Sequence, residues 1–212
     1  MFTKVNKSDI PEGTKIVDTK WVYVIKRKTN GTIEKYKARK VGRGFTQEAG
    51  ISYDTDKTYA QMMHPEALKI LLVIALHRGW AIRQWDVVAA YLQATLHHDV
   101  YVSDINEQSE VEYWKLNKAL YRLKQVGHEW FKTLQKILQL VGLEQCIEDE
   151  GTYTSSNGQL IIGSHVDDLL GIALTETDLD KVEQSVEKHV ELDKRGKPSK
   201  LLGMELTWKK GE

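Results

Sequence analysis

The sequence has little cysteine, little proline and no long apolar run. Cys146 is the single cysteine among 212 residues, so an internal disulfide is excluded. A structural zinc site is disfavoured as well, because it usually needs several Cys or His ligands at close spacing. The longest apolar run, residues 70–76, is far too short to cross a bilayer, and the N-terminus lacks the apolar stretch of a secretory signal. These absences favour an intracellular protein, cytoplasmic or nuclear, that is neither secreted nor bound to a membrane.

A net charge is also lacking, because 30 Lys and Arg balance 30 Asp and Glu. The distribution is nevertheless uneven. Residues 20–44 contain nine basic side chains and one acid, Glu34, whereas residues 99–112 contain five acids and no Lys or Arg. Basic residues at such density are typical of a surface that contacts phosphate groups. A solvated charged surface explains the charge alone equally well.

The periodicity of apolar residues predicts an α+β fold. Alternation over residues 21–28 and 32–45, around Asn30-Gly31, predicts a β-hairpin that carries the basic residues. Helices are expected over residues 65–78, 128–141 and 177–190, the first apolar on nearly all sides and therefore buried. Further strands are expected over residues 80–87, 101–102, 111–116, 151–155, 159–166, 169–174 and 201–208. This order predicts an antiparallel sheet backed by helices, after an irregular lead-in at residues 1–18.

Two adjacent carboxylates, Asp167 and Asp168, interrupt a pair of apolar runs. They would be costly if buried, because they repel each other and lose hydration, so they fit either an exposed hairpin turn or a cation site. If strands 80–86 and 159–167 are neighbours, Asp86 joins them at one edge of the sheet. Such a trio would hold two Mg²⁺ ions about 4 Å apart, which can activate a primer hydroxyl and stabilise leaving pyrophosphate.

Five segments carry recognisable motifs: KYKARKVGRGFTQEAGISYDTDKTYA (35–60), QWDVVAAYLQ (84–93), KALYRLKQVGHEWF (118–131), HVDDLL (165–170) and LLGMEL (201–206). In this order they resemble the reverse transcriptases of copia-type retrotransposons, over roughly residues 15–208. One match alone is weak, whereas five in the family's order form a strong signal. Arg122 stands where the family usually has glycine, and His165 where it usually has tyrosine.

The resemblance implies a polymerase palm, which is a ferredoxin-like antiparallel sheet backed by helices, with a β-hairpin fingers subdomain and an absent or truncated thumb. The fingers would occupy mainly residues 19–64 and part of 98–128, and the palm the remainder of 19–212. The implied function is the RNA-directed DNA polymerase core of a retrotransposon. It would add deoxynucleotides to a primed template by two-metal nucleotidyl transfer.

The same resemblance assigns roles to single residues. Asp86, Asp167 and Asp168 would be the catalytic ligands of two Mg²⁺ ions, or of Mn²⁺, and the backbone carbonyl of Val87 would add another ligand. Leu201, Leu202 and Gly203 resemble the segment that grips the primer. A simple buried strand would look the same.

Further roles concern the incoming nucleotide. Arg39 resembles the fingers arginine that contacts the triphosphate, assisted by Lys26 or Arg27, although each could be a solvated surface charge. Gln125 matches the glutamine beside the nucleotide and the template base. Tyr91 matches the aromatic gate that excludes a ribose 2′-hydroxyl, with an ordinary core tyrosine as the alternative.

The implied partners are an RNA or DNA template with its primer, deoxynucleoside triphosphates, and the integrase and RNase H domains of a retroelement polyprotein. No membrane partner is expected. The alternative function is that of a catalytically inactive, truncated or decaying remnant that still binds nucleic acid. Primer extension separates the two hypotheses.

Overall fold

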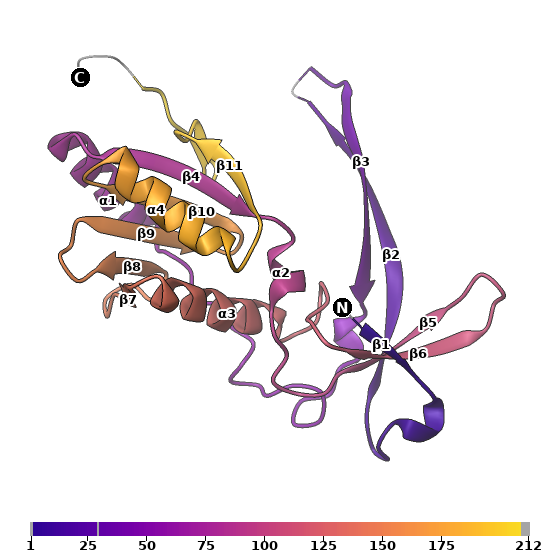
Figure 1. Cartoon of the computed structure of the whole chain (residues 1–212). Coiled ribbons are helices and arrows are strands. Elements are labelled where there is room, and N and C mark those ends of the chain that lie inside the picture. Colours follow the sequence, from indigo (N-terminus) through magenta and orange to yellow (C-terminus); the bar gives the residue numbers. More distant parts are fainter. Residues whose placement is uncertain (1, 29, 209–212) are drawn as a thin grey trace. The chain divides into compact units, whose positions relative to one another are not determined.

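The computed structural model describes residues 2–28 and 30–208, and it has the mixed α+β architecture that the sequence predicts. The chain divides into two compact units, with the elements labelled in Figure 1. Unit 1 comprises Met1–Ala60 and Tyr91–Trp130, and unit 2 comprises Gln61–Ala90 and Phe131–Glu212. None of the helices in the described part of the chain is long and apolar enough to cross a membrane.

Unit 1 contains a five-stranded sheet with the order β1-β6-β5-β2-β3. Its strands are β1 (Phe2–Val5), β2 (Ile16–Arg27), β3 (Ile33–Gly42), β5 (Tyr101–Ile105) and β6 (Val111–Leu116). The pairs are antiparallel except for β2 and β5, where residues 16–18 run parallel to residues 101–103. Within the lead-in that was expected to be irregular, residues 2–5 form β1 and residues 16–18 begin β2. Strand β1 is mostly exposed and is held by backbone pairing with β6. An exposed strand needs no alternation of apolar residues, so the sequence did not indicate it.

The β2–β3 hairpin has two chemically different faces, because paired residues of neighbouring strands point to the same side. The basic face carries the paired residues Val22, Val24, Lys26, Lys35, Lys37 and Arg39. The aromatic face carries Trp21, Tyr23, Ile25, Tyr36, Ala38 and Lys40. On the aromatic face the ring of Trp21 stacks on that of Tyr23, with centroids 6.3 Å apart. The hairpin predicted from alternation is thus present, and its charge is concentrated on one side.

Unit 2 contains a six-stranded antiparallel sheet with the order β11-β4-β10-β9-β8-β7. Its strands are β4 (Ala81–Val87), β7 (Leu143–Gln145), β8 (Thr152–Ser155), β9 (Leu160–His165), β10 (Asp168–Ala173) and β11 (Leu192–Gly196). The edge strand β11, with the sequence LDKRG, has no apolar alternation and was not expected. A continuous strand over residues 201–208 was expected, but the chain forms a small hairpin of β12 (Lys200–Leu201) and β13 (Met204–Glu205).

The three expected helices are present, over Pro65–Arg78, Val126–Leu140 and Glu176–Glu187, where 65–78, 128–141 and 177–190 were expected. Helix α1 (Pro65–Arg78) has proline in its first turn and ends at Gly79, whose φ of 65° is left-handed. Helix α4 (Glu176–Glu187) is capped by the Thr175 hydroxyl, which accepts from the backbone N–H of Asp178. The other helices are α2 (Ala90–Gln93), α3 (Val126–Leu140) and the short 3₁₀ turns η1 (Lys7–Asp9) and η2 (Gly44–Thr46).

Helix α1 packs only one side on the sheet of unit 2. Leu68 and Leu71 join a buried cluster with Ile82 of β4 and Ile172 of β10. The opposite side is exposed, since Val73 keeps 64% of its surface accessible to solvent. The expectation of an all-round buried helix is therefore wrong, because the sheet covers a single face and nothing in the described chain covers the other apolar side chains.

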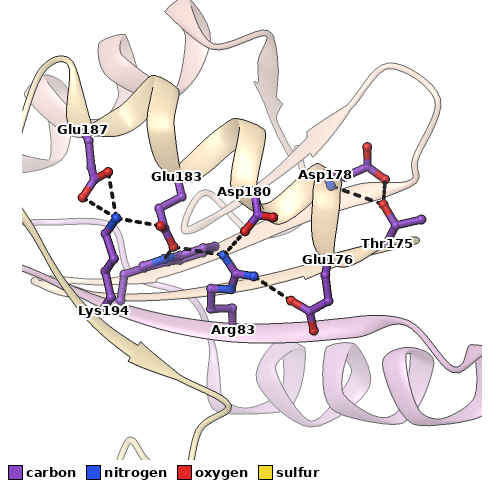
Figure 2. Close-up of polar contacts among 9 residues, drawn as sticks. Arg83, Thr175, Glu176, Asp178, Asp180, Glu183, Glu187 and Lys194 are labelled. Carbon is purple, nitrogen blue, oxygen red and sulfur yellow. Dashed lines mark hydrogen bonds and ion pairs between the residues drawn. The ribbon is translucent and has the colours of Figure 1, made fainter.

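A network of charged side chains binds helix α4 to strands β4 and β11, and Figure 2 shows it. The guanidinium of Arg83 contacts three carboxylates, those of Glu176 and Asp180 at 2.7 Å and that of Glu183 at 3.1 Å. Glu183 also accepts from the Trp85 indole at 2.6 Å and pairs with Lys194 at 2.8 Å. The network fixes β4 and β11 to α4. Strand β4 also carries Asp86, and β11 carries Arg195.

Candidate active site

The predicted carboxylates of unit 2 lie at one end of its sheet. Asp86 of β4 stands directly opposite Asp168, the first residue of β10, so both side chains leave the same face. Opposed residues of this kind have Cβ atoms about 4.5–5.5 Å apart. Asp167 is exposed in the turn just before β10. The sequence left open whether β4 and β9 are neighbours, and the structure places β10 between them, so Asp168 rather than Asp167 faces Asp86.

The turn that joins β9 to β10 is strained. His165 pairs with Asp168, which leaves a two-residue loop of Val166 and Asp167, and Val166 has a φ of 59°. A left-handed φ is unfavourable for a β-branched side chain, and glycine normally takes the first position of such a turn. The backbone N–H of Val87 donates to the carbonyl of Asp167 at 2.7 Å, which fixes the turn to the end of β4. Strain of this kind is often retained at functional sites.

The electrostatics of the carboxylates follow from their crowding. Burial, and then the negative charges of Asp167 and Asp168, raise the pKa of the Asp86 carboxyl, and Arg195 opposes that rise. Arg195 of β11 lies 3.3 Å from Asp86 and 3.0 Å from Asp193. The sheet end therefore concentrates negative charge that a nearby cation would stabilise.

Two side chains beside the carboxylates were not predicted as site residues. Gln84 is buried, and its amide donates to Asp168 at 3.0 Å. It stands two residues before Asp86, on the same face of β4, and this spacing could have revealed it. Arg195 lies in the segment LDKRG, which reads as an ordinary solvated loop, so no local pattern could have identified it.

The donor chemistry of this site fits a hard divalent cation. Carboxylate and carbonyl oxygens are the ligands that Mg²⁺ takes in proteins, and burial together with the charges of Asp167 and Asp168 raises the pKa of the Asp86 carboxyl. Within residues 2–28 and 30–208, no group of three or more His, Cys, Asp or Glu side chains is already gathered as a metal cage. The register nevertheless brings Asp86 and Asp168 to one face, and Asp167 directly precedes Asp168 in the chain.

The predicted nucleotide-binding residues belong to unit 1. Lys26 and Arg39 share the basic face of the β2–β3 hairpin. Arg27 follows a register shift in β2, and its guanidinium donates to the carbonyl of Gly31 at 3.0 Å. Lys26 and Arg39 thus lie on one face of the hairpin, four residues apart along the strands, while Arg27 contacts the hairpin loop.

Gln125 is buried and engaged with protein partners. Its side-chain oxygen accepts from the Gln47 amide at 3.0 Å, and its own amide donates to the carbonyl of Ser52 at 3.3 Å. Gln47 also accepts from the backbone N–H of Lys124 at 2.7 Å. Gln47 was not predicted, since a glutamine between two loop residues reads as solvated. The pair ties the loop after η2 to the segment that precedes α3.

Tyr91 and Arg39 contact the same aromatic ring. The ring of Tyr91, in α2, packs edge-on against that of Tyr121, with centroids 5.7 Å apart at an interplanar angle of 67°. The guanidinium carbon of Arg39 lies 5.4 Å from the centroid of Tyr121. The sequence motifs contain all three residues but do not show that Tyr121 joins the other two.

The predicted primer-grip residues form the β12–β13 hairpin of unit 2. Its two-residue loop consists of Leu202 and Gly203, with φ of 47° and 81°, the signature of a type I′ turn. Leu201 is buried against the apolar cluster beneath α1, whereas Gly203 is exposed. The hairpin is thus anchored by one leucine, and its tip projects from the core.

Comparison with known proteins agrees with the motifs. Residues 3–212 match the family model described as reverse transcriptase (RNA-dependent DNA polymerase). The chain is 34% identical over 194 residues to the retrovirus-related Pol polyprotein from transposon RE1 of Arabidopsis thaliana, which covers 86% of this chain and 13% of that protein. It is 27% identical over 206 residues to the corresponding polyprotein from transposon TNT 1-94 of Nicotiana tabacum, covering 93% of this chain and 15% of the relative. The chain therefore spans about an eighth of the length of such relatives.

Proposed function

The chain belongs to the reverse transcriptase (RNA-dependent DNA polymerase) family, and we propose that it forms the fingers and palm of an RNA-directed DNA polymerase from a copia-type retrotransposon. In this proposal unit 1 supplies the fingers and unit 2 the palm. Its partners are a primed RNA or DNA template and deoxynucleoside triphosphates, with integrase and RNase H as further parts of the polyprotein. The observation that supports it most directly is the opposition of Asp86 and Asp168 beside the strained Val166 turn.

Asp86, Asp167 and Asp168, with the carbonyl of Val87, would hold the two Mg²⁺ ions, or Mn²⁺. When bound, such ions activate the primer 3′-hydroxyl and neutralise charge on the leaving pyrophosphate. The chain's own residues bind and orient the reactants, and positioning of this kind supplies much of the rate in phosphoryl transfer. Gln84 would keep the Asp168 carboxylate oriented, since its amide already donates to that group.

The fingers residues would act on the nucleotide. Arg39, with Lys26 or Arg27, would contact the triphosphate, because Arg39 and Lys26 lie on the basic face of the hairpin. Tyr91 would exclude a ribose 2′-hydroxyl and so favour a DNA product. Gln125 would lie beside the nucleotide and the template base, and Gln47 would hold its side chain in place by donating to its amide oxygen. Leu201, Leu202 and Gly203 would grip the primer.

Primer extension on poly(rA)/oligo(dT) with dTTP and Mg²⁺ tests this function. We expect extension by the wild-type chain and its loss in Asp86→Asn, Asp167→Asn and Asp168→Asn, because each removes a ligand charge. Asp56→Asn is the matched control, since Asp56 is an exposed loop residue of unit 1. Template binding without any extension by the wild-type chain would instead support the inactive remnant.

A further inference from the structure

Tyr121 lies between two side chains to which the proposed function gives separate tasks. The rings of Tyr91 and Tyr121 form a T-shaped pair with centroids 5.7 Å apart, and the guanidinium carbon of Arg39 lies 5.4 Å from the Tyr121 centroid. The three residues come from different segments of unit 1: β3, α2 and the stretch before α3. A single ring thus connects the expected triphosphate contact with the expected sugar gate.

The backbone around Tyr121 is held tightly against the end of β3. The carbonyl of Tyr121 accepts from the N–H of Gly42, the last residue of β3, at 3.0 Å. Arg122 follows with a left-handed φ of 69°, and a Cβ on Gly44 would overlap the carbonyl of Arg122. Because β3 also carries Arg39, the same strand supports both the Arg39 side chain and the backbone of Tyr121.

The two contacts are of kinds that orient their partners. An edge-on aromatic pair fixes the tilt of both rings, and a guanidinium over a ring face is attracted by the electron-rich centre of the ring. Both contacts need the ring of Tyr121, and neither uses its hydroxyl. Tyr121 is partly exposed, as are Tyr91 and Arg39, so the trio lies at the surface of unit 1.

We propose that Tyr121 is a positioning residue that sets Tyr91 and Arg39 as one unit, so that recognition of the sugar and of the triphosphate depend on each other. This inference rests on the proposed polymerase function. It gives Tyr121 a role in nucleotide selection, beyond any contribution of its packing to stability. Loss of the ring would loosen the gate and the triphosphate contact together.

The test measures KM and kcat for dTTP and for UTP on poly(rA)/oligo(dT) with wild type, Tyr121→Leu and Tyr121→Phe. Leucine keeps apolar bulk without an aromatic ring, so Tyr121→Leu should raise KM for dTTP and lower discrimination against UTP, each by about five- to tenfold. Tyr121→Phe should behave like the wild type, because it keeps both ring contacts. Tyr113→Leu is the control, since Tyr113 is a partly exposed tyrosine of β6 in the same unit.

A second arm combines substitutions. In a Tyr91→Ala background, Tyr121→Leu should change discrimination against UTP no further, because the gate that it positions is already gone. Additive effects, or a Tyr121→Leu enzyme that melts earlier but keeps its KM and sugar selectivity, would overturn the inference. A wild-type chain that extends no primer overturns the proposed function and this inference with it. Wild-type extension with unchanged Tyr121→Leu selectivity overturns the inference alone.

Discussion

Asp86 and Asp168 face each other across neighbouring antiparallel strands, and Arg195 of the next strand lies 3.3 Å from the Asp86 carboxylate. A protein cation therefore contacts a group that we expect to bind metal. The two uses of the carboxylate are in competition. The contact is partly exposed, so its contribution is about 0–1 kcal/mol.

Replacing Arg195 should consequently strengthen metal binding. We expect Arg195→Gln to bind Mn²⁺ about two- to fivefold more tightly than the wild type in a titration followed by electron paramagnetic resonance. Lys194→Gln is the control for net charge, because Lys194 is the adjacent residue but pairs with Glu183 and Glu187. An equal gain in both variants, or no gain in Arg195→Gln, would refute the competition.

Arg122 should be destabilising at its position. Its φ of 69° is left-handed and its side chain is exposed, so it has the strain without a packing gain. Such a conformation costs a non-glycine residue about 1–2 kcal/mol. Glycine avoids this cost but loses more backbone entropy on folding, which offsets part of the gain. We expect Arg122→Gly to raise the free energy of unfolding in urea by about 0.5–1 kcal/mol. Arg122→Ala, which keeps the strain, should change it little.

Glu183 should make stability depend on pH in the acid range. Burial alone would raise the pKa of Glu183, but hydrogen bonds from Lys194, Trp85 and Arg83 outweigh it and lower the pKa. A lowered carboxyl pKa contributes stability above the unfolded value of about 4.3, and that stability is lost as the pH falls through the folded value.

Denaturant unfolding between pH 7 and pH 3 measures this contribution. We expect the wild type to lose stability below about pH 4.3 and Glu183→Gln to show a shallower loss. At pH 7, Glu183→Ala should cost about 1–3 kcal/mol, since the buried Trp85 N–H loses its acceptor. A Glu183→Gln curve parallel to that of the wild type would contradict the assignment.

A side chain at Gly171 should destabilise unit 2. A Cβ there would overlap the six-membered ring of Trp85 and come within 3.0 Å of Leu179. We expect Gly171→Ala to lower the free energy of unfolding by about 1–3 kcal/mol through overpacking. Adding Trp85→Phe should make room, so the double variant should be more stable than the sum of the two single losses predicts. Strict additivity would show that the ring is not the obstacle.

Local features of the fold were predictable because their causes are local. Pro65 marks the start of α1 and Gly79 its end, and the alternation from Trp21 onward predicts the β2–β3 hairpin. The spatial order of strands was not predictable, since no local pattern states that β10 separates β4 from β9. For the same reason the contact of Gln47 with the predicted Gln125 was missed, because burial of a polar residue depends on what surrounds it.

The candidate site divides in the same way. The motifs identify Asp86, Asp167 and Asp168 as residues of interest, while the register decides that Asp86 faces Asp168. Arg195 reaches this place through pairing across strands, which sequence spacing does not encode, whereas Gln84 stands two residues before Asp86 on the same face of β4. Tyr121 is a further case, since its two partners lie 82 and 30 positions away in the chain.

Because the β2–β3 hairpin has two different faces, its loop sets which side chains lie on which face. Side chains alternate strictly along a strand, so a slip of one residue in β3 would turn Arg39 and Lys37 to the opposite side. The loop bonds that prevent such a slip include Lys28 N–H to Thr32 and Gly31 N–H to Lys28, both at 2.9 Å. A one-residue insertion or deletion in this loop would then shift the register of β3 by one residue. The basic side chains of β3 would face the opposite side of the hairpin, although the sequence would keep every charged residue.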